Sequence, residues 1–414
     1  MANINDYLNW RGDLPINKNF PFNEIDALIL ARFSYLPFHK IKMNSKETIE
    51  NISKRMKDFS NDDFIYNGDK ELISNLGKSA RFKEMLVTDF VRNTSKKHEE
   101  QFCAITIHVS NKEIYVSYIG TDSTINGWKE DFNMMFLEKI PCQISGMNYL
   151  TKIGEKHPFC KIRIGGHSKG GNIAIFSALN VAKKIQSKII KVYNYDGPGF
   201  RKEIIEQYEN SSILNKVETY IPQDSVVGRL LYHKEKITIV HSLEKGVLQH
   251  DIFSWEVLND DFIYSEKITE ESEDIDKTIT TWFEETSNEQ RKIVVDTVFD
   301  ILYSTENENV KDLTQNIAKK VTKAIKAYNS ISKEEKETIN NTVSLIVKKY
   351  INIRTDREKK KIKDSIKTIR KRWFLGQVRK TCKNVFRTCL KNHLIVLIFS
   401  LINLLFSLFL FVAK

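Results

Sequence analysis

The chain of 414 residues has few cysteines and no recognisable export signal. Its five cysteines are scattered and form no Cys-x-x-Cys pair, so neither a disulfide framework nor a zinc site is indicated, and we expect no metal or cofactor. This cysteine usage is typical of a reducing compartment. Residues 1–7 contain no positively charged stretch followed by an apolar one, so the N-terminus does not predict a cleaved export signal.

The composition is that of a folded protein with one sizeable domain and extensions. Hydrophobic residues make up 41% and charged residues 28%, and 24 phenylalanines indicate a substantial core. The net charge of +11 is concentrated in one segment. Residues 352–392 carry 15 Lys or Arg against three Asp or Glu, a balance of +12, so the rest of the chain carries about −1.

The most informative stretch is a glycine-rich turn between an expected strand and an expected helix. Ser168 lies between Gly166 and Gly170, preceded by His167 and followed by Lys169, with a second glycine at Gly171. A serine on so sharp a turn leaves no room for neighbouring side chains, and the helix that follows favours developing negative charge. The pattern therefore predicts a nucleophile elbow.

Strands and helices alternate around this turn, which favours an α/β fold with a mostly parallel sheet and a site at the strand ends. We expect a helix at residues 24–33 and surface helices over 45–95. A hairpin is expected over 102–109 and 113–119, where Asn111 and Lys112 form the turn. Further strands are expected at 159–164, 189–195, 217–221 and 237–241, and further helices at 142–156 and 201–214.

A serine nucleophile needs a histidine base and a carboxylate that orients it, in the chain order Ser, Asp or Glu, His. Asp224, in a turn after the second strand following the nucleophile helix, is the favoured acid, and Asp196 is the alternative. His250, in a loop after a strand, is the favoured base. His241 ends a strand and is more simply a sheet-edge residue, while His233 is expected to be solvated.

Acyl transfer also needs two amide donors for the oxyanion. Lys169 supplies one main-chain N–H, and its side chain is either solvated or suited to anionic substrates. The loop at Gly120 and Thr121, at the end of an expected strand, is placed to supply the other. We expect His167 to pack and form hydrogen bonds beneath the turn.

These residues, with Trp128 and Asp131, resemble the class-three (triacylglycerol) lipases. The resemblance implies a Ser168–Asp224–His250 triad and an oxyanion hole formed by Thr121 and Lys169. Ile119, Lys169 and Asn172 depart from that pattern. The chain is also similar to an uncharacterised bacterial group of lipase-like α/β-hydrolases, through Asn3–Asp13 and Gly166–Asn172. This second resemblance covers about residues 1–260 and implies no particular substrate.

The C-terminal part changes character. We expect a hydrolase domain over 1–265 and an acidic linker with helices over 266–350. A basic amphipathic helix is expected over 351–392, and a transmembrane anchor over 393–414. The anchor prediction rests on 19 almost uniformly apolar residues from Leu394 to Val412. Its basic N-terminal flank predicts a cytoplasmic hydrolase domain.

The leading hypothesis is a membrane-tethered serine hydrolase acting on carboxylic esters, with lipid acyl esters as the favoured class. The alternative is an inactive membrane-anchored scaffold or sensor on a hydrolase fold. Nucleic acid is not an expected partner, because the basic segment precedes an apolar span and is explained by attraction to anionic headgroups.

Overall fold

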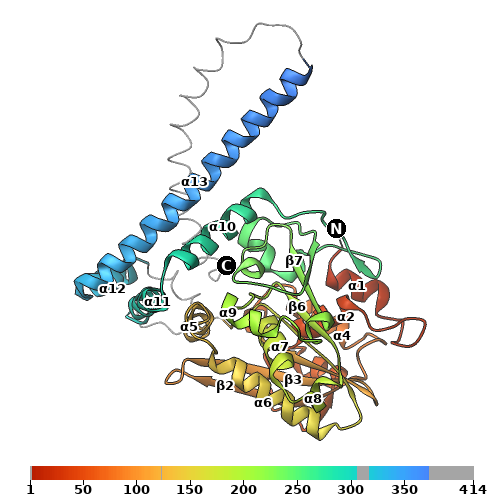
Figure 1. The fold of residues 1–414 in the computed structure, drawn as a ribbon. Coiled ribbons are helices and arrows are strands. Elements are labelled where there is room, and N and C mark those ends of the chain that lie inside the picture. The colour runs from red at the N-terminus through yellow and green to blue at the C-terminus, as the bar shows by residue number, and fades with distance from the viewer. Residues whose placement is uncertain (1, 123, 305–316, 373–414) are drawn as a thin grey trace. The chain divides into compact units, whose positions relative to one another are not determined.

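The computed structural model describes residues 2–122, 124–304 and 317–372. The chain divides into two units, Met1–Ser272 and Glu273–Lys414. The first unit is built on an eight-stranded mixed sheet in the order β1-β2-β3-β4-β5-β6-β7-β8. Figure 1 labels β2, β3, β6 and β7 of this sheet. The strands are β1 (Lys46–Thr48), β2 (Leu86–Ser95), β3 (Glu100–Ser110), β4 (Glu113–Tyr118), β5 (Lys161–His167), β6 (Ile189–Tyr195), β7 (Val217–Pro222) and β8 (Lys236–Val240). A short separate ribbon pairs β9 (Val257–Leu258) with β10 (Asp261–Phe262).

The sheet has an antiparallel half and a parallel half. Strands β1 to β4 pair antiparallel, and the predicted hairpin is present as β3 and β4. Strands β4 to β8 pair parallel. The expectation of surface helices over 45–95 is wrong for the part that forms β1 and β2. The α/β class is correct, but the parallel part of the sheet is smaller than expected.

The register of the parallel half brings three strand ends together. Tyr118 of β4 is paired with Gly166 of β5, and Gly166 is paired with Asn194 of β6. The loops that follow these strands therefore leave the sheet side by side. Parallel sheets present their ligand sites at this edge.

Helices cover both faces of the sheet. The helices of the first unit include α1 (Ile4–Arg11), α2 (Glu24–Phe33), α3 (Ile49–Met56), α4 (Asp69–Leu76), α5 (Ile125–Asn133), α6 (Pro141–Lys156), α7 (Lys169–Asn180), α8 (Lys183–Gln186) and α9 (Lys202–Ile205). One core packs α2 against Tyr115 and Tyr193, and the other packs α6 and α7 against Val116 and Val192. Adjacent residues of one strand thus enter opposite cores, as the pleat requires.

The expected helix over 201–214 is shorter than predicted. It consists of α9 and the 3₁₀ segments η3 (Glu206–Tyr208) and η4 (Leu214–Lys216). Further 3₁₀ segments are η1 (Phe38–Lys40), η2 (Asn61–Asp63), η5 (Val227–Arg229), η6 (Gly246–His250) and η7 (Ile252–Ser254).

The acidic stretch beginning at Glu270 is helical rather than an irregular linker. It forms the start of α10 (Glu270–Glu285), where the Thr269 hydroxyl accepts a hydrogen bond from the N–H of Ser272. Acidic residues in a first turn are stabilised by the helix dipole, which explains why the charge run does not prevent a helix.

The second unit is helical in the parts that the structure describes. Its helices include α11 (Asn288–Tyr303), α12 (Ile317–Ser330) and α13 (Lys333–Arg372), and α13 takes up the first half of the predicted basic segment. Across residues 2–122, 124–304 and 317–372, no helix combines the length and apolar character needed to cross a bilayer. The predicted span at 394–412 lies outside the described residues.

Candidate active site

Ser168 occupies the sharp turn between β5 and α7 that the sequence predicts. Its backbone angles are φ 57° and ψ −135°, a strained combination for a residue with a side chain. A Cβ added to Gly166 would lie 2.4 Å from the carbonyl carbon of Gly170, and one added to Gly170 would lie 2.2 Å from the carbonyl oxygen of Tyr118. The turn therefore excludes side chains at both positions, while Ser168 itself remains partly exposed.

His250, at the end of η6, is paired with a carboxylate. Its Nδ1 lies 2.6 Å from Oδ2 of Asp196, and the carboxyl group of Asp196 is only 1% exposed. The other oxygen of Asp196 accepts hydrogen bonds from the hydroxyl of Ser225 at 2.5 Å and from the N–H of Gly228 at 3.1 Å. The carboxylate is thus fixed by two further donors and holds the imidazole of His250 through Nδ1.

Main-chain and ring contacts place this pair beside Ser168. The N–H of Ser168 donates to the carbonyl of Tyr195 at 2.9 Å, and Gly197 lies directly against the Ser168 carbonyl. Asp196, between these two residues, is therefore held next to the elbow. On the other side, the ring of His167 lies 4.4 Å, centroid to centroid, from the ring of His250.

Asp224, the acid that the sequence analysis favoured, is not the partner of His250. Its carboxylate accepts hydrogen bonds from the N–H of Gly246 and the hydroxyl of Thr269, and its own N–H donates to Gln249. The reason is strand order. Asp196 follows β6, the neighbour of β5, whereas Asp224 follows β7, which lies one strand spacing further away at about 4.8 Å per strand. Asp224 instead braces the segment that leads to His250.

The two remaining candidate histidines have partners of their own. His241 Nδ1 contacts Glu256, which fits its reading as a sheet-edge residue. His233 is largely buried, contrary to expectation, and its Nδ1 lies 2.7 Å from Glu235. Burial raises the pKa of Glu235, but the hydrogen bonds from His233 and Thr219 outweigh it and lower that pKa to about 2.

His167 lies beneath the turn, with its side chain in the interior. Its Nε2 lies 2.9 Å from the carbonyl of His250, and its own carbonyl accepts a hydrogen bond from the Tyr35 hydroxyl at 3.0 Å. Burial, with a further contribution from His250, holds the pKa of His167 well below its usual range. The neutral imidazole of His167 bonds to the main chain at His250. It therefore helps to hold the expected base in place and does not itself act as the base.

The loop expected to carry the second oxyanion donor reaches the elbow. A Cβ on Gly120 would lie 3.1 Å from Cβ of Ser168, so Thr121 follows at close range. The Thr121 hydroxyl donates to Oδ2 of Asp131 on α5. Burial raises the pKa of Asp131 to about 6, and the opposing effects of Lys169 and Thr121 offset it only in part.

The side chain of Lys169 is neither solvated nor available to a substrate. Its exposure is 0%, and its Nζ lies 2.9 Å from Oε2 of Glu130. Burial lowers the pKa of Lys169, but the carboxylates of Glu130 and Asp131 outweigh burial and hold it above the usual value. The ammonium group is therefore buried and charged, and it is held in place by the carboxylates of Glu130 and Asp131.

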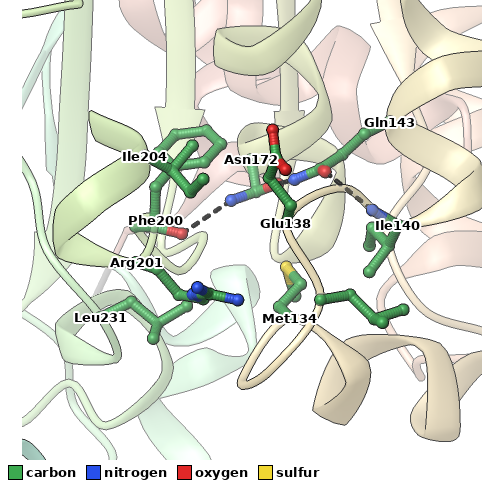
Figure 2. Close-up of a pocket in the computed structure, with 11 residues that line it drawn as sticks. Met134, Glu138, Ile140, Gln143, Asn172, Phe200, Arg201, Ile204 and Leu231 are labelled. Carbon is green, nitrogen blue, oxygen red and sulfur yellow. Dashed lines mark hydrogen bonds between the residues drawn. The ribbon is translucent and has the colours of Figure 1, made fainter. Parts of the chain in front are cut away.

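Asn172, one turn along α7, ties this helix to the loop that carries Asp196. Its Nδ2 donates to the carbonyls of Pro198 at 3.1 Å and Gly199 at 2.8 Å. Its Oδ1 accepts a hydrogen bond from Gln143 (Figure 2). A pocket beside Asn172 is lined by Met134, Leu137, Glu138, Ile140, Gln143, Gly199, Phe200, Arg201, Ile204 and Leu231 as well (Figure 2). Ser168, Asp196 and His250 are not among these lining residues.

Sequence reasoning ranked Asp196 second and missed Tyr35, Gln101 and Glu130 entirely. For Asp196 a signal was present, because it directly follows the first strand after the nucleophile helix. The other three are 38 to 133 positions from Ser168, and no local pattern marks them. Among the described residues, no cluster of three or more His, Cys, Asp or Glu side chains is arranged to hold a metal ion.

The mixed sheet, the elbow and the paired histidine define a lipase-like α/β-hydrolase fold. The Mbeg1-like family model matches residues 76–300, more than half of the chain, and the protein belongs to that family. No curated protein matches the sequence.

Comparison with solved structures returns lipases at low identity and low TM-score. A fungal lipase in complex with an inhibitor is 13% identical, with a TM-score of 0.37 over 53% of this chain and 78% of its own. A triacylglycerol lipase, described as having a serine protease triad as its catalytic centre, is 13% identical, with a TM-score of 0.36 over 54% of this chain and 82% of its own. A lipase from Rhizopus microsporus var. chinensis is 13% identical, with a TM-score of 0.34 over 52% and 72%.

Proposed function

We propose that the protein is a serine hydrolase of carboxylic esters with Ser168, His250 and Asp196 as its triad. The observation that carries the proposal is the 2.6 Å contact of His250 Nδ1 with Asp196 Oδ2, beside a strained serine elbow. A carboxylate on Nδ1 fixes the tautomer in which Nε2 can accept a proton. Among the three His–carboxylate pairs in the described part of this domain, it is the position of the His250–Asp196 pair beside Ser168 that favours acyl transfer.

In the proposed reaction Ser168 Oγ attacks the ester carbonyl while His250 takes up its proton. His250 then protonates the leaving alkoxide. In the second step a water molecule, deprotonated by the same imidazole, attacks the acyl-enzyme, the bond from the acyl carbon to Ser168 Oγ breaks, and His250 returns the proton to Oγ as the acid leaves. The main-chain N–H groups of Thr121 and Lys169 stabilise the oxyanion in both steps. The carboxylate of Asp196 stabilises the imidazolium that forms on His250.

Lipid acyl esters are the substrate class that we favour, because the sequence predicts a bilayer anchor at 393–414 next to a basic segment. Such a tether would hold a cytoplasmic hydrolase domain at an anionic membrane surface. The family membership supports a lipase-like reaction without selecting an acyl chain.

The direct test is labelling of the full chain, in its membrane fraction, with a fluorophosphonate probe. We expect Ser168→Ala to abolish both labelling and hydrolysis of a p-nitrophenyl acyl ester. Ser187→Ala is a suitable control, since it removes an exposed serine hydroxyl that donates to the carbonyl of Lys184, outside the triad and the oxyanion loop. Labelling of Ser168→Ala at the wild-type level would remove Ser168 as the nucleophile and favour an inactive scaffold.

A further inference from the structure

The ammonium group of Lys169 is the centre of a buried charged cluster. This cluster contacts the loop at Gly120 and Thr121, which we call the oxyanion loop. Its Nζ donates to Oε2 of Glu130 at 2.9 Å and to Oε1 and the main-chain oxygen of Gln101 at 2.8 and 3.2 Å. Oδ1 of Asp131 lies 3.5 Å away. The side chains of both Lys169 and Glu130 are 0% exposed. Burying an ammonium ion costs free energy that an apolar side chain of similar size would not incur.

Two of these partners, Gln101 and Asp131, connect Lys169 to the oxyanion loop through hydrogen bonds. Gln101, on β3, uses its Nε2 to donate to the carbonyl of Gly120 at 3.3 Å. Asp131, on α5, accepts a hydrogen bond from the hydroxyl of Thr121. The same ammonium group therefore contacts two side chains that hold consecutive residues of the loop, one through its main chain and one through its side chain.

Glu130 fixes the positions from which these connections start. Its Oε2 accepts a hydrogen bond from the N–H of Gln101 at 2.9 Å, and its Oε1 accepts one from the N–H of Cys142 at 2.8 Å. The counter-ion of Lys169 thus links β3, α5 and the first turn of α6. A polar network in which the charged groups have several partners is rigid, because moving one member breaks several bonds.

Lys169 also follows the nucleophile and is the residue whose main-chain N–H forms half of the proposed oxyanion hole. We propose that Lys169 is a positioning residue, which uses its buried side chain to hold the Gly120–Thr121 loop at a fixed distance from its own amide. This inference rests on the proposed hydrolase function. Oxyanion donors act in the transition state and depend on precise placement. In this proposal the Lys169 side chain fixes the distance between the two donors, the main-chain N–H groups of Thr121 and Lys169.

The experiment compares Lys169→Met with the charge-compensated double variant Lys169→Met/Glu130→Gln. Methionine is an unbranched side chain one atom shorter than lysine, and it removes the donors. We expect kcat for a p-nitrophenyl acyl ester to fall about 10- to 100-fold in both variants with KM little changed, since the lost interaction is made in the transition state. The double variant removes the unpaired carboxylate but leaves one of the two N–H groups bound by Glu130 without an acceptor, so its melting temperature should recover in part.

Recovered stability with a kcat still at least 10-fold low supports the inference, whereas recovery of kcat together with stability overturns it. If the double variant does not fold, Gln101→Met provides the second measurement. That change removes the bond to Gly120 and leaves the Lys169–Glu130 ion pair, and a several-fold loss in kcat is expected. A wild-type kcat in Gln101→Met overturns the inference.

A control ion pair lies near the N-terminal ends of β4 and β5, the strands whose C-terminal ends lead to Gly120 and Ser168. Arg163 of β5 and Glu113 of β4 form an ion pair at 2.5 Å, and Arg163→Met/Glu113→Gln should leave kcat unchanged. Ser168→Ala distinguishes a failure of the Lys169 inference from a failure of the proposed hydrolase function. Its loss of activity, beside a wild-type kcat in the Lys169 double variant, overturns the Lys169 inference alone. Hydrolysis that survives Ser168→Ala overturns the proposed function and this inference together.

Discussion

His250 Nδ1 lies 2.6 Å from Oδ2 of Asp196, a residue 54 positions earlier in the chain. The pairing joins the loop after β6 to the end of η6 and places a buried carboxylate behind the imidazole. Asp224, which follows the next strand, bonds instead to the chain before His250. Substitution of Asp196 is therefore expected to affect catalysis, and substitution of Asp224 is expected to affect mainly stability.

Asp196→Asn should lower kcat about 10³- to 10⁴-fold, because an amide cannot stabilise the imidazolium and permits the wrong tautomer. Asp224→Asn should lower the free energy of unfolding by about 1–2 kcal/mol and leave kcat within about tenfold of the wild type. Ester hydrolysis and urea denaturation of both variants measure these effects. The assignment fails if Asp224→Asn shows the larger loss of kcat.

Tyr35 links the two loops that meet at the elbow, since its hydroxyl accepts a hydrogen bond from the N–H of Gly120 at 2.9 Å and donates to the carbonyl of His167 at 3.0 Å. Tyr35→Phe should leave both groups without this partner. We expect a loss of about 1–3 kcal/mol in the free energy of unfolding and a fall of about tenfold in kcat.

The control for this variant is Tyr115→Phe. The hydroxyl of Tyr115 is also buried, and it donates to the carbonyl of Ala27 at 3.0 Å, away from the elbow. This change should reduce stability but not kcat. Equal kinetic effects in the two variants would show that the Tyr35 hydroxyl contributes to folding only.

Asp131 predicts a specific dependence of stability on pH. Its pKa is raised to about 6 in the folded protein, mainly by burial, against 3.8 for the ordinary group. Between these values the folded state binds more protons than the unfolded state, so this aspartate destabilises the fold as pH rises. The penalty is absent below about pH 4 and reaches roughly 3 kcal/mol above pH 6.

The measurement compares the wild type with Asp131→Asn, in which the amide oxygen can still accept the hydrogen bond from Thr121. The free energy of unfolding of the wild type, relative to the variant, should decline from pH 4 to pH 6 and then stay constant. A difference that is independent of pH would contradict the raised pKa of Asp131.

The sequence prediction of an anchor at 393–414 is tested by deletion. The full chain should stay with membranes after a high-salt wash, whereas a chain that ends at residue 392 should be released. The remaining basic segment attracts anionic headgroups by about 1 kcal/mol per Lys or Arg near the surface, and salt screens that attraction. Retention of the shortened chain on phosphatidylserine vesicles in high salt would count against the anchor.

The sequence by itself determined the features that depend on neighbouring residues. The elbow at Ser168 could be predicted, because strand, glycine turn and helix are consecutive in the chain and the turn sterically requires glycine. The hairpin of β3 and β4 followed from an equally local pattern. The strand β2 was missed, since its exposed polar residues resemble a surface helix.

The tertiary structure decided which groups meet. Asp196 and Asp224 both follow strands, and only the order of β5, β6 and β7 in the sheet puts one of them beside His250. The charge of Lys169 looked solvent-facing in the sequence, yet its partners Glu130 and Gln101 lie 39 and 68 positions away and enclose it. Burial and pairing are properties of packed surfaces, so residue type and spacing along the chain could not fix them.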